Sequence, residues 1–258
     1  MISLQNVSYS YRGNQAVRNV SASLAPGELV GVVGANGSGK STLLKLMARV
    51  LTPLSGSITY ADRDLTKWNR RAYAREVGYL PQDLDPILSL RAVDVVLSGR
   101  AAFLGRFEWE SSQDRLIAER ALDLCDVSAL ADRPLEEMSG GERKRIFLAR
   151  VLAGQPRLIL LDEPFAALDL AHIQQMFTVL LTLCRERGCS IVFVSHDLNW
   201  SSAFADSMLV MHQGELVRSG RPGDVMQSEV MRDYFHFDGQ TLRDSSGRQW
   251  IVPRILAP

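Results

Sequence analysis

Cysteine is scarce in this sequence, which has only Cys125, Cys184 and Cys189 among its 258 residues. An odd, scattered set suits reduced thiols in a cytosolic core better than a disulfide framework, and it lacks the spacing of a metal site. The sequence also has no apolar run near the ~20 residues that span a bilayer. Residues 1–6 alternate like a strand and lack the features of a signal peptide.

An excess of one charge is absent too, because Lys+Arg and Asp+Glu number 29 each. No global basic field therefore attracts the chain to nucleic acid. Sequence repeats and low-complexity tracts are also missing. Hydrophobic residues make up 46% and charged residues 22%, which is ordinary for a soluble globular protein. The length suffices for one large domain with a core, or for two small ones.

What the sequence does contain is a glycine-rich stretch between a short apolar strand pattern, 28–33, and a helix pattern, 43–48. It reads Gly34-Ala35-Asn36-Gly37-Ser38-Gly39-Lys40-Ser41-Thr42 and fits G-x-x-x-x-G-K-[ST]. Glycines let backbone N–H groups converge on phosphates, and the helix start adds its positive dipole end. Lys40 can reach the β- and γ-phosphates, and the Ser41 hydroxyl can ligate Mg²⁺. The stretch predicts a triphosphate site rather than a mere strand-to-helix turn.

Two acids follow a second apolar strand pattern. Residues 158–161 are all Leu or Ile, and Asp162 and Glu163 come next, before a proline. Beside a phosphate loop, an Asp at a strand end is expected on Mg²⁺ through water, and the next acid can face the attacking water. A strand-terminal Asp-Glu pair alone is usually only solvated. The glycine-rich loop is what favours the functional interpretation here.

Strand and helix patterns occupy different parts of the chain. Residues 89–155 have helical apolar spacing, which predicts a helical insertion with helices at 92–99, 112–125 and 142–152. Short strands are predicted on both sides of it, at 3–9, 17–24, 29–33, 57–64 (a hairpin), 77–80, 191–194, 207–219 (a second hairpin) and 250–253. A further helix is predicted at 171–185.

Other positions carry weaker signals. Tyr11, at a turn, suits either stacking on a purine base or a half-buried strand end, and spacing alone favours the strand end. Gln82 follows a strand and by itself suggests a loop glutamine. Residues 139–142, Ser-Gly-Gly-Glu, open a helix as either a second anion site or an ordinary cap. His196 stands at the tip of a predicted parallel strand, on the edge where open α/β sheets bind ligands. Residues 99–109 mix aromatics, glycines and arginines, which fits a docking surface or a partly buried loop.

Taken together, these segments resemble an ATP-binding cassette (ABC) transporter ATPase over nearly the whole chain. Gly34–Thr42 matches Walker A, Leu158–Asp162 matches Walker B, and Glu163 matches the catalytic glutamate. The remaining matches are Gln82 for the Q-loop, His196 for the switch histidine, Asp169 in the D-loop, Tyr11 for the base-stacking aromatic, and Ser139, Gly140, Gly141 and Glu142 for the signature. Met138 and Glu142 replace the usual Leu and Gln of that signature, and Phe165-Ala166 stand where Thr-Ser is common.

The resemblance implies an α/β fold with a P-loop (RecA-like) core, an N-terminal antiparallel β subdomain and an α-helical subdomain. Residues 1–258 would form a single ABC ATPase domain, with the helical part near 89–155 and a tail from about 224. Within the family, the chain is similar to ATPases of importers for iron–siderophore complexes, heme or cobalamin. That similarity lies in residues 96–107, 168–172 and 242–253.

The resemblance also implies ATP and Mg²⁺ as ligands, and a homodimer with ATP held between Walker A of one copy and the signature of the other. Separate transmembrane permease subunits and, indirectly, a substrate-binding protein are the implied partners, without nucleic acid. The expected location is peripheral, on the cytoplasmic face of the inner membrane. The alternatives are an importer ATPase for free manganese or zinc, a soluble non-transport ABC ATPase, and, from another class, a plain nucleotide kinase. The signature and His196 argue against the kinase.

Overall fold

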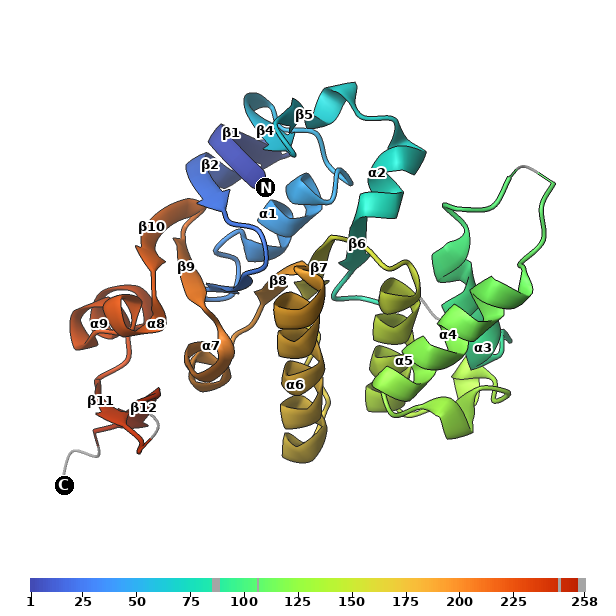
Figure 1. The fold of residues 1–258 in the computed structure, drawn as a ribbon. Helices are drawn as coiled ribbons and strands as arrows, with labels where there is room; N and C mark the ends of the chain where they lie inside the picture. The colour runs from blue at the N-terminus through green and yellow to red at the C-terminus, as the bar shows by residue number, and fades with distance from the viewer. Residues whose placement is uncertain (85–88, 106, 246, 255–258) are drawn as a thin grey trace. The chain divides into compact units, whose positions relative to one another are not determined.

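The structure is a computed structural model that describes residues 1–84, 89–105, 107–245 and 247–254. The chain divides into two compact units. The first consists of Met1–Lys67 with Ser190–Pro258, and the second of Trp68–Cys189. Figure 1 follows the chain through them by colour. Within the described residues, no helix combines the length and apolarity needed to cross a bilayer.

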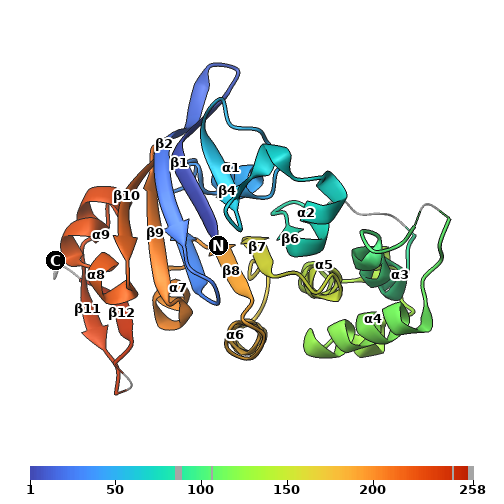
Figure 2. The ribbon, with the colours of Figure 1, turned by 45° about the horizontal axis from the view of Figure 1, so that its top comes forward.

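An antiparallel sheet opens the first unit. Its strand order is β2-β1-β4-β5, with bounds β1 Ile2–Tyr11, β2 Asn14–Leu24, β4 Ser55–Tyr60 and β5 Arg63–Asp64. Figure 2 shows β1 between β2 and β4. One face is buried because apolar side chains recur at alternate positions, such as Ile2, Leu4 and Val17. The short 3₁₀ helix η1 (Leu65–Lys67) follows β5.

The first unit also contains the strand that leads into the glycine-rich loop. β3 (Leu29–Val33) pairs in parallel with β8 (Ser190–Val194) and with β9 (Ser207–His212), and β10 (Glu215–Gly220) pairs antiparallel with β9. Every residue of β3 and β8 is buried, as expected for the nearly continuous apolar sequences of these parallel strands. Helix α1 (Lys40–Met47) begins at the end of the loop.

The second unit is mainly helical. Among its described residues, the strands β6 (Val77–Leu80) and β7 (Leu158–Asp162) pair in parallel. α3 and α4 pack on each other and on α5, as both views show. The helices are α2 Arg70–Glu76, α3 Ala92–Leu97, α4 Ser112–Leu124, α5 Gly140–Ala153 and α6 Leu170–Arg187, with 3₁₀ turns η2 Ser98–Arg100, η3 Ser128–Leu130 and η4 Leu135–Glu137. The helices predicted at 92–99, 112–125, 142–152 and 171–185 are thus confirmed, with small shifts at their ends.

The C-terminal part of the chain returns to the first unit. It contains α7 Leu198–Phe204, α8 Pro222–Val225, α9 Ser228–Phe235, and the hairpin β11 Gly239–Arg243 with β12 Gln249–Pro253. The Asn199 side chain of α7 binds both backbone groups of Ile251, accepting from its N–H at 2.7 Å and donating to its carbonyl at 3.3 Å. The predicted strand at 250–253 is confirmed, whereas its partner strand, α2 and α7–α9 had no prediction.

Candidate functional site

The glycine-rich loop curls around the amine of its own lysine. Lys40 Nζ donates to the carbonyls of Gly34 at 2.8 Å and Ala35 at 2.9 Å, and the residue is only 6% exposed. Helix α1 has Gly39 as its N-cap, so no side chain covers its first N–H groups. A buried positive charge and a bare helix start therefore face one small volume, as a phosphate group requires.

At two positions of the loop, neighbouring backbone lies so close that only glycine fits. A Cβ at Gly34 would lie 2.2 Å from the Met211 carbonyl oxygen, and one at Gly39 would lie 2.2 Å from that of Ala16. Both residues also have positive φ, 154° and 101°. Ser38 is 2% exposed, and its hydroxyl has no hydrogen-bond partner within the described residues. An oxygen of a bound phosphate would satisfy this buried hydroxyl, so the residues present fit a phosphate ligand.

The structure places His196 at the same edge of the first unit as the loop. β3 and β8 are parallel neighbours, so the segments after Val33 and Val194 both leave the sheet at its carboxyl edge. His196 is exposed there, and Asp197 caps α7 by accepting from the Trp200 N–H at 3.0 Å. Tyr11 ends β1 with 41% of its surface exposed and stands edge-on to Tyr9, at a centroid separation of 4.9 Å.

The second unit brings together two residues that the sequence separates by 81 positions. Gln82 Nε2 donates to Glu163 Oε2 at 3.4 Å, because β6 and β7 are parallel and end at one edge. Asp162, the last residue of β7, is fully buried. Glu163 has a φ of 49°, a left-handed backbone that is uncommon for a non-glycine residue and is often found at functional sites.

Lys144 belongs to this group, although no motif pointed to it. Its Nζ donates to the Gln82 carbonyl at 3.2 Å, and the residue is 7% exposed. Burial lowers the pKa of its amine, while Glu163, Asp162 and Asp83 act in the opposite direction. The only signal in the sequence was its place one helical turn after Gly140, on the apolar face of α5.

The segment that opens α5 is a complete capping box. Ser139 Oγ accepts from the Glu142 N–H at 3.2 Å, and Glu142 Oε2 accepts from the Ser139 N–H at 2.7 Å. Hydrogen bonds to the Glu142 carboxyl from the side chain and from the backbone N–H of Ser139 lower the pKa of that carboxyl. A Cβ at Gly141 would lie 2.9 Å from the Ala167 carbonyl oxygen, so this helix start packs closely against the segment before α6. Asp169 caps α6 and contacts His172 Nδ1 at 2.8 Å.

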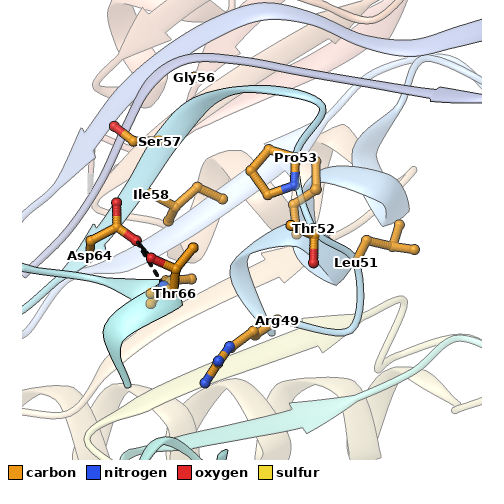
Figure 3. A pocket seen from close by; sticks show the side chains of 11 residues that line it. Arg49, Leu51, Thr52, Pro53, Gly56, Ser57, Ile58, Asp64 and Thr66 are labelled. Atoms are coloured by element: carbon orange, nitrogen blue, oxygen red, sulfur yellow. Dashed lines mark hydrogen bonds between the residues drawn. The ribbon is translucent and has the colours of Figure 1, made fainter. Parts of the chain in front are cut away.

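A separate pocket of about 170 Å³ lies in the first unit and is drawn in Figure 3. It is bounded by the end of α1 and by β4, and Asp64 on its wall accepts from the Thr66 N–H at 2.7 Å. None of its lining residues is a predicted site residue. Its volume is below the roughly 300–1,000 Å³ of most ligand pockets, and we assign it no function.

Known proteins are similar to this chain in sequence and in fold. The family model described as ABC transporter matches residues 17–166. The hemin import ATP-binding protein HmuV of Rhizobium meliloti (strain 1021) is 36% identical over 264 residues, covering 99% of this chain and 98% of that protein.

Two solved structures extend the comparison. One is a transporter assigned to the metal-chelate type of ABC transporter, in an inward-facing conformation. It is 29% identical with a TM-score of 0.84, and the match covers 98% of this chain and 97% of that chain. The other is a dimeric ATP-binding cassette in a post-hydrolysis state with ADP and Pi. It is 27% identical with a TM-score of 0.76, covering 86% and 99%.

Proposed function

Because this chain belongs to the ABC transporter family, we propose that it powers import of an iron chelate, heme or cobalamin across a membrane. The resemblance to the ABC transporter family, the ABC ATPase fold class and ATP hydrolysis are confirmed. The observation that carries the proposal is the Lys40 loop, combined with a second glycine-rich helix start at Ser139. The cargo class rests on the hemin importer and the metal-chelate transporter to which the chain is similar.

In the proposed site, residues 34–42 hold the triphosphate of ATP. Their backbone N–H groups and Lys40 donate to phosphate oxygens, and Tyr11 stacks on the base. Ser41, Gln82 and Asp162 would hold Mg²⁺, which when bound neutralises phosphate charge. Glu163 accepts a proton from the attacking water, Gln82 orients that carboxylate, and His196 contacts the terminal phosphate.

The second half of each site is proposed to come from another copy of the chain. Ser139–Gly141 form the start of α5, which is rich in backbone N–H donors and is closed by a capping box. Asp169 is the N-cap of α6. In a two-fold dimer, this segment faces the Walker A loop of the partner, and the interface is isologous. The similar cassette that forms a dimer with ADP and Pi supports this arrangement. ATP would close the dimer, and phosphate release would open it.

Permease subunits are the partners that the importer relatives imply for this chain. We propose that they bind at residues 101–105 and 107–109, here called the docking loop. Arg106, which belongs to the stretch 99–109 predicted as a docking surface or a partly buried loop, lies outside the described residues. Phe107 and Trp109 are each 89% exposed, and aromatic side chains anchor interfaces. A short helix of a membrane subunit would cover them, which holds the chain at the cytoplasmic face of the inner membrane. A substrate-binding protein would deliver the cargo outside.

Uptake measurements on a strain lacking this gene test the cargo class. The strain receives either the wild-type gene or the Lys40→Ala gene, and uptake of labelled siderophore, heme, cobalamin, manganese and zinc is measured in each. Only the wild-type gene should restore uptake of one chelate. If only manganese or zinc uptake depends on the gene, the chain serves a free-metal importer instead. Co-purification with nucleic acid, without membrane subunits, would indicate a soluble machine.

A further inference from the structure

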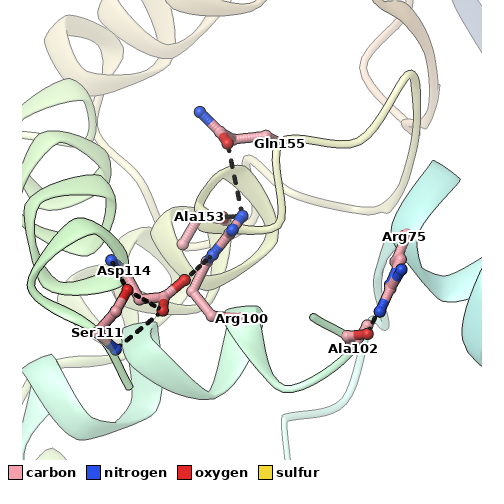
Figure 4. Close-up of polar contacts among 7 residues, drawn as sticks. All are labelled: Arg75, Arg100, Ala102, Ser111, Asp114, Ala153 and Gln155. Atoms are coloured by element: carbon pink, nitrogen blue, oxygen red, sulfur yellow. Dashed lines mark hydrogen bonds and ion pairs between the residues drawn. The ribbon is translucent and has the colours of Figure 1, made fainter. Parts of the chain in front are cut away.

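Arg100 is a buried arginine in the helical second unit and belongs to none of the nucleotide motifs. It ends η2, is 8% exposed, and its Nε donates to Asp114 Oδ1 at 2.8 Å. Its Nη1 donates to the Ala153 carbonyl at 3.1 Å and to Gln155 Oε1 at 3.5 Å. Figure 4 shows the guanidinium between these partners. The Phe103 ring lies 3.9 Å from its central carbon, so one side chain joins four segments.

Asp114 is held equally firmly on its other side. Its Oδ2 accepts from the Ser111 N–H at 3.0 Å and from the Ser111 hydroxyl at 2.6 Å, which completes the capping box of α4. These bonds from Ser111, with that from Arg100, lower the pKa of the Asp114 carboxyl to about 2. The carboxylate therefore stays ionised at neutral pH and fixes the start of α4 to Arg100.

The next residues along the chain are held by α2. The Ala102 carbonyl accepts from Arg71 Nε at 2.8 Å and from Arg75 Nε at 2.7 Å, and Figure 4 shows the second contact. Arg75 also lies 5.3 Å from the Phe103 ring. α2 continues directly into β6, and Gln82 stands two residues beyond that strand. The start of the docking loop is thus tied to the segment that carries Gln82.

The far end of α5 is the other attachment. α5 begins at the Ser139 cap and ends at Ala153, whose carbonyl Arg100 binds. A Cβ at Gly99 would lie 2.1 Å from the Arg150 carbonyl oxygen, so η2 runs directly against this helix. Since an α-helix is stiff along its axis, a displacement at Ala153 moves Ser139 as well.

We propose that Arg100 is the positioning residue that makes the docking loop, α5 and α2 move as one body, so that membrane subunits acting on Phe107 and Trp109 reach Ser139 and Gln82. This inference rests on the proposed function, which supplies the membrane subunits. Breaking a buried, hydrogen-bonded ion pair loosens the segments that it joins. Loss of Arg100 should therefore weaken the stimulation of ATP hydrolysis by bound membrane subunits, while the nucleotide site itself stays intact.

The test compares ATP hydrolysis by the purified chain alone with hydrolysis by its complex with the permease subunits in proteoliposomes. Arg100→Met removes every polar contact, and Arg100→Lys keeps the charge with fewer donors. Arg115→Met, an exposed arginine beside Asp114 on α4, is the matched control. Rates are normalised to folded protein, so that a loss of stability alone does not change them.

Arg100→Met should leave hydrolysis by the chain alone within about twofold, while stimulation by the permease falls about tenfold, a usual size for coupling between sites. Arg100→Lys should fall between, and Arg115→Met should match wild type. If Arg100→Met does not fold, Arg71→Gln combined with Arg75→Gln loosens the same loop from the surface and should also reduce stimulation. Unchanged stimulation in the folded variants, or an equal fall in both assays, overturns the inference. Wild type without any stimulation counts instead against the proposed permease partnership.

Discussion

The two units of this chain build polar sites in opposite ways. In the first unit the glycine-rich loop is built from local backbone, and Lys40 binds the carbonyls of Gly34 and Ala35, six and five positions earlier. In the second unit the contact between Gln82 and Glu163 is made by two side chains that lie 81 positions apart in the sequence. A backbone site needs fixed local spacing and leaves a motif in the sequence. A side-chain site needs only the fold and leaves isolated residues that no pattern connects.

Glu163→Gln should break the second unit's chemistry most strongly. The amide keeps the size of the side chain and can still contact Gln82, but it accepts no proton from water. We expect kcat to fall by roughly 10²–10⁴-fold, the usual contribution of a general base, while ATP still binds and a closed dimer accumulates. Turnover at fixed protein, with nucleotide binding measured in parallel, checks this. Near wild-type turnover would remove Glu163 from its proposed role.

Lys40→Ala should impair the site of the first unit at the step of ATP binding. The substitution removes the buried Lys40 amine, which is proposed to bind the phosphates, and leaves the backbone of the loop in place. ATP affinity should fall by about tenfold or more, since a hydrogen bond to a charged group is worth about 1.5–3 kcal/mol, while the fold persists. Calorimetric titration with ATP, alongside circular dichroism, measures both. Unchanged affinity contradicts the assignment of Lys40.

Mixing two variants tests whether the loop of one copy and the Ser139 segment of another copy form one shared site. A Ser139→Arg chain and a Lys40→Ala chain are each expected to be inactive alone. Randomly formed dimers of equal amounts should recover roughly a quarter of wild-type hydrolysis, because half are mixed and each mixed dimer keeps one intact shared site. A mixture as inactive as either parent indicates that each chain completes its own site.

Asp114→Asn should have a smaller effect, on stability rather than chemistry. It leaves the buried Arg100 guanidinium without a counter-charge, so unfolding free energy should fall by about 3 kcal/mol at pH 7. Asp132→Asn, which removes an 87% exposed partner of Arg91, should cost less than about 1 kcal/mol. Urea unfolding measures both. Equal losses in the two variants contradict the interpretation.

The same pair predicts a pH dependence with a definite sign. The folded pKa of Asp114 is lowered to about 2 from an ordinary value near 3.8. A lowered pKa contributes stability above the unfolded value and loses it as pH falls towards the folded one. The stability difference between wild type and Asp114→Asn should therefore shrink between pH 5 and pH 2. A constant difference across that range would contradict the ion pair.

The difference between local backbone sites and distant side-chain contacts also explains which features of the structure the sequence predicts. Local signals sufficed for the loop at 34–42, for β3 and β7, and for the helices of the 89–155 region, because spacing and apolar periodicity are local properties. The joining of Gln82 to Glu163 was not predicted, since it depends on β6 and β7 being neighbours. The contacts of Lys144 and Arg100 were not predicted for the same reason: Lys144 binds Gln82, and Arg100 binds Asp114 and Ala153, which lie on other elements of the fold.

Short elements were the other gap. α2 and α7 have seven residues each, too few for a periodic apolar pattern to stand out. Their starts are nevertheless capped, by Asn69 and Asp197. Such caps are a usable signal, but without a following apolar period they resemble ordinary turn residues. The strand β11 was missed because it is mostly exposed and has no alternating apolar pattern.

The C-terminal hairpin depends on α7 in a way that can be used as a reporter. An isolated two-stranded hairpin is marginally stable in water, and here Asn199 of α7 binds the backbone of Ile251 on both sides. α7 begins two residues after His196, so the hairpin is fastened to the element next to the proposed switch histidine. Arg243 and Arg248, at the two sides of the hairpin turn, are trypsin sites. The rate of trypsin cleavage at these two sites, compared with and without nucleotide, therefore reports whether α7 loosens its contact with the hairpin. The measurement needs no label on the protein.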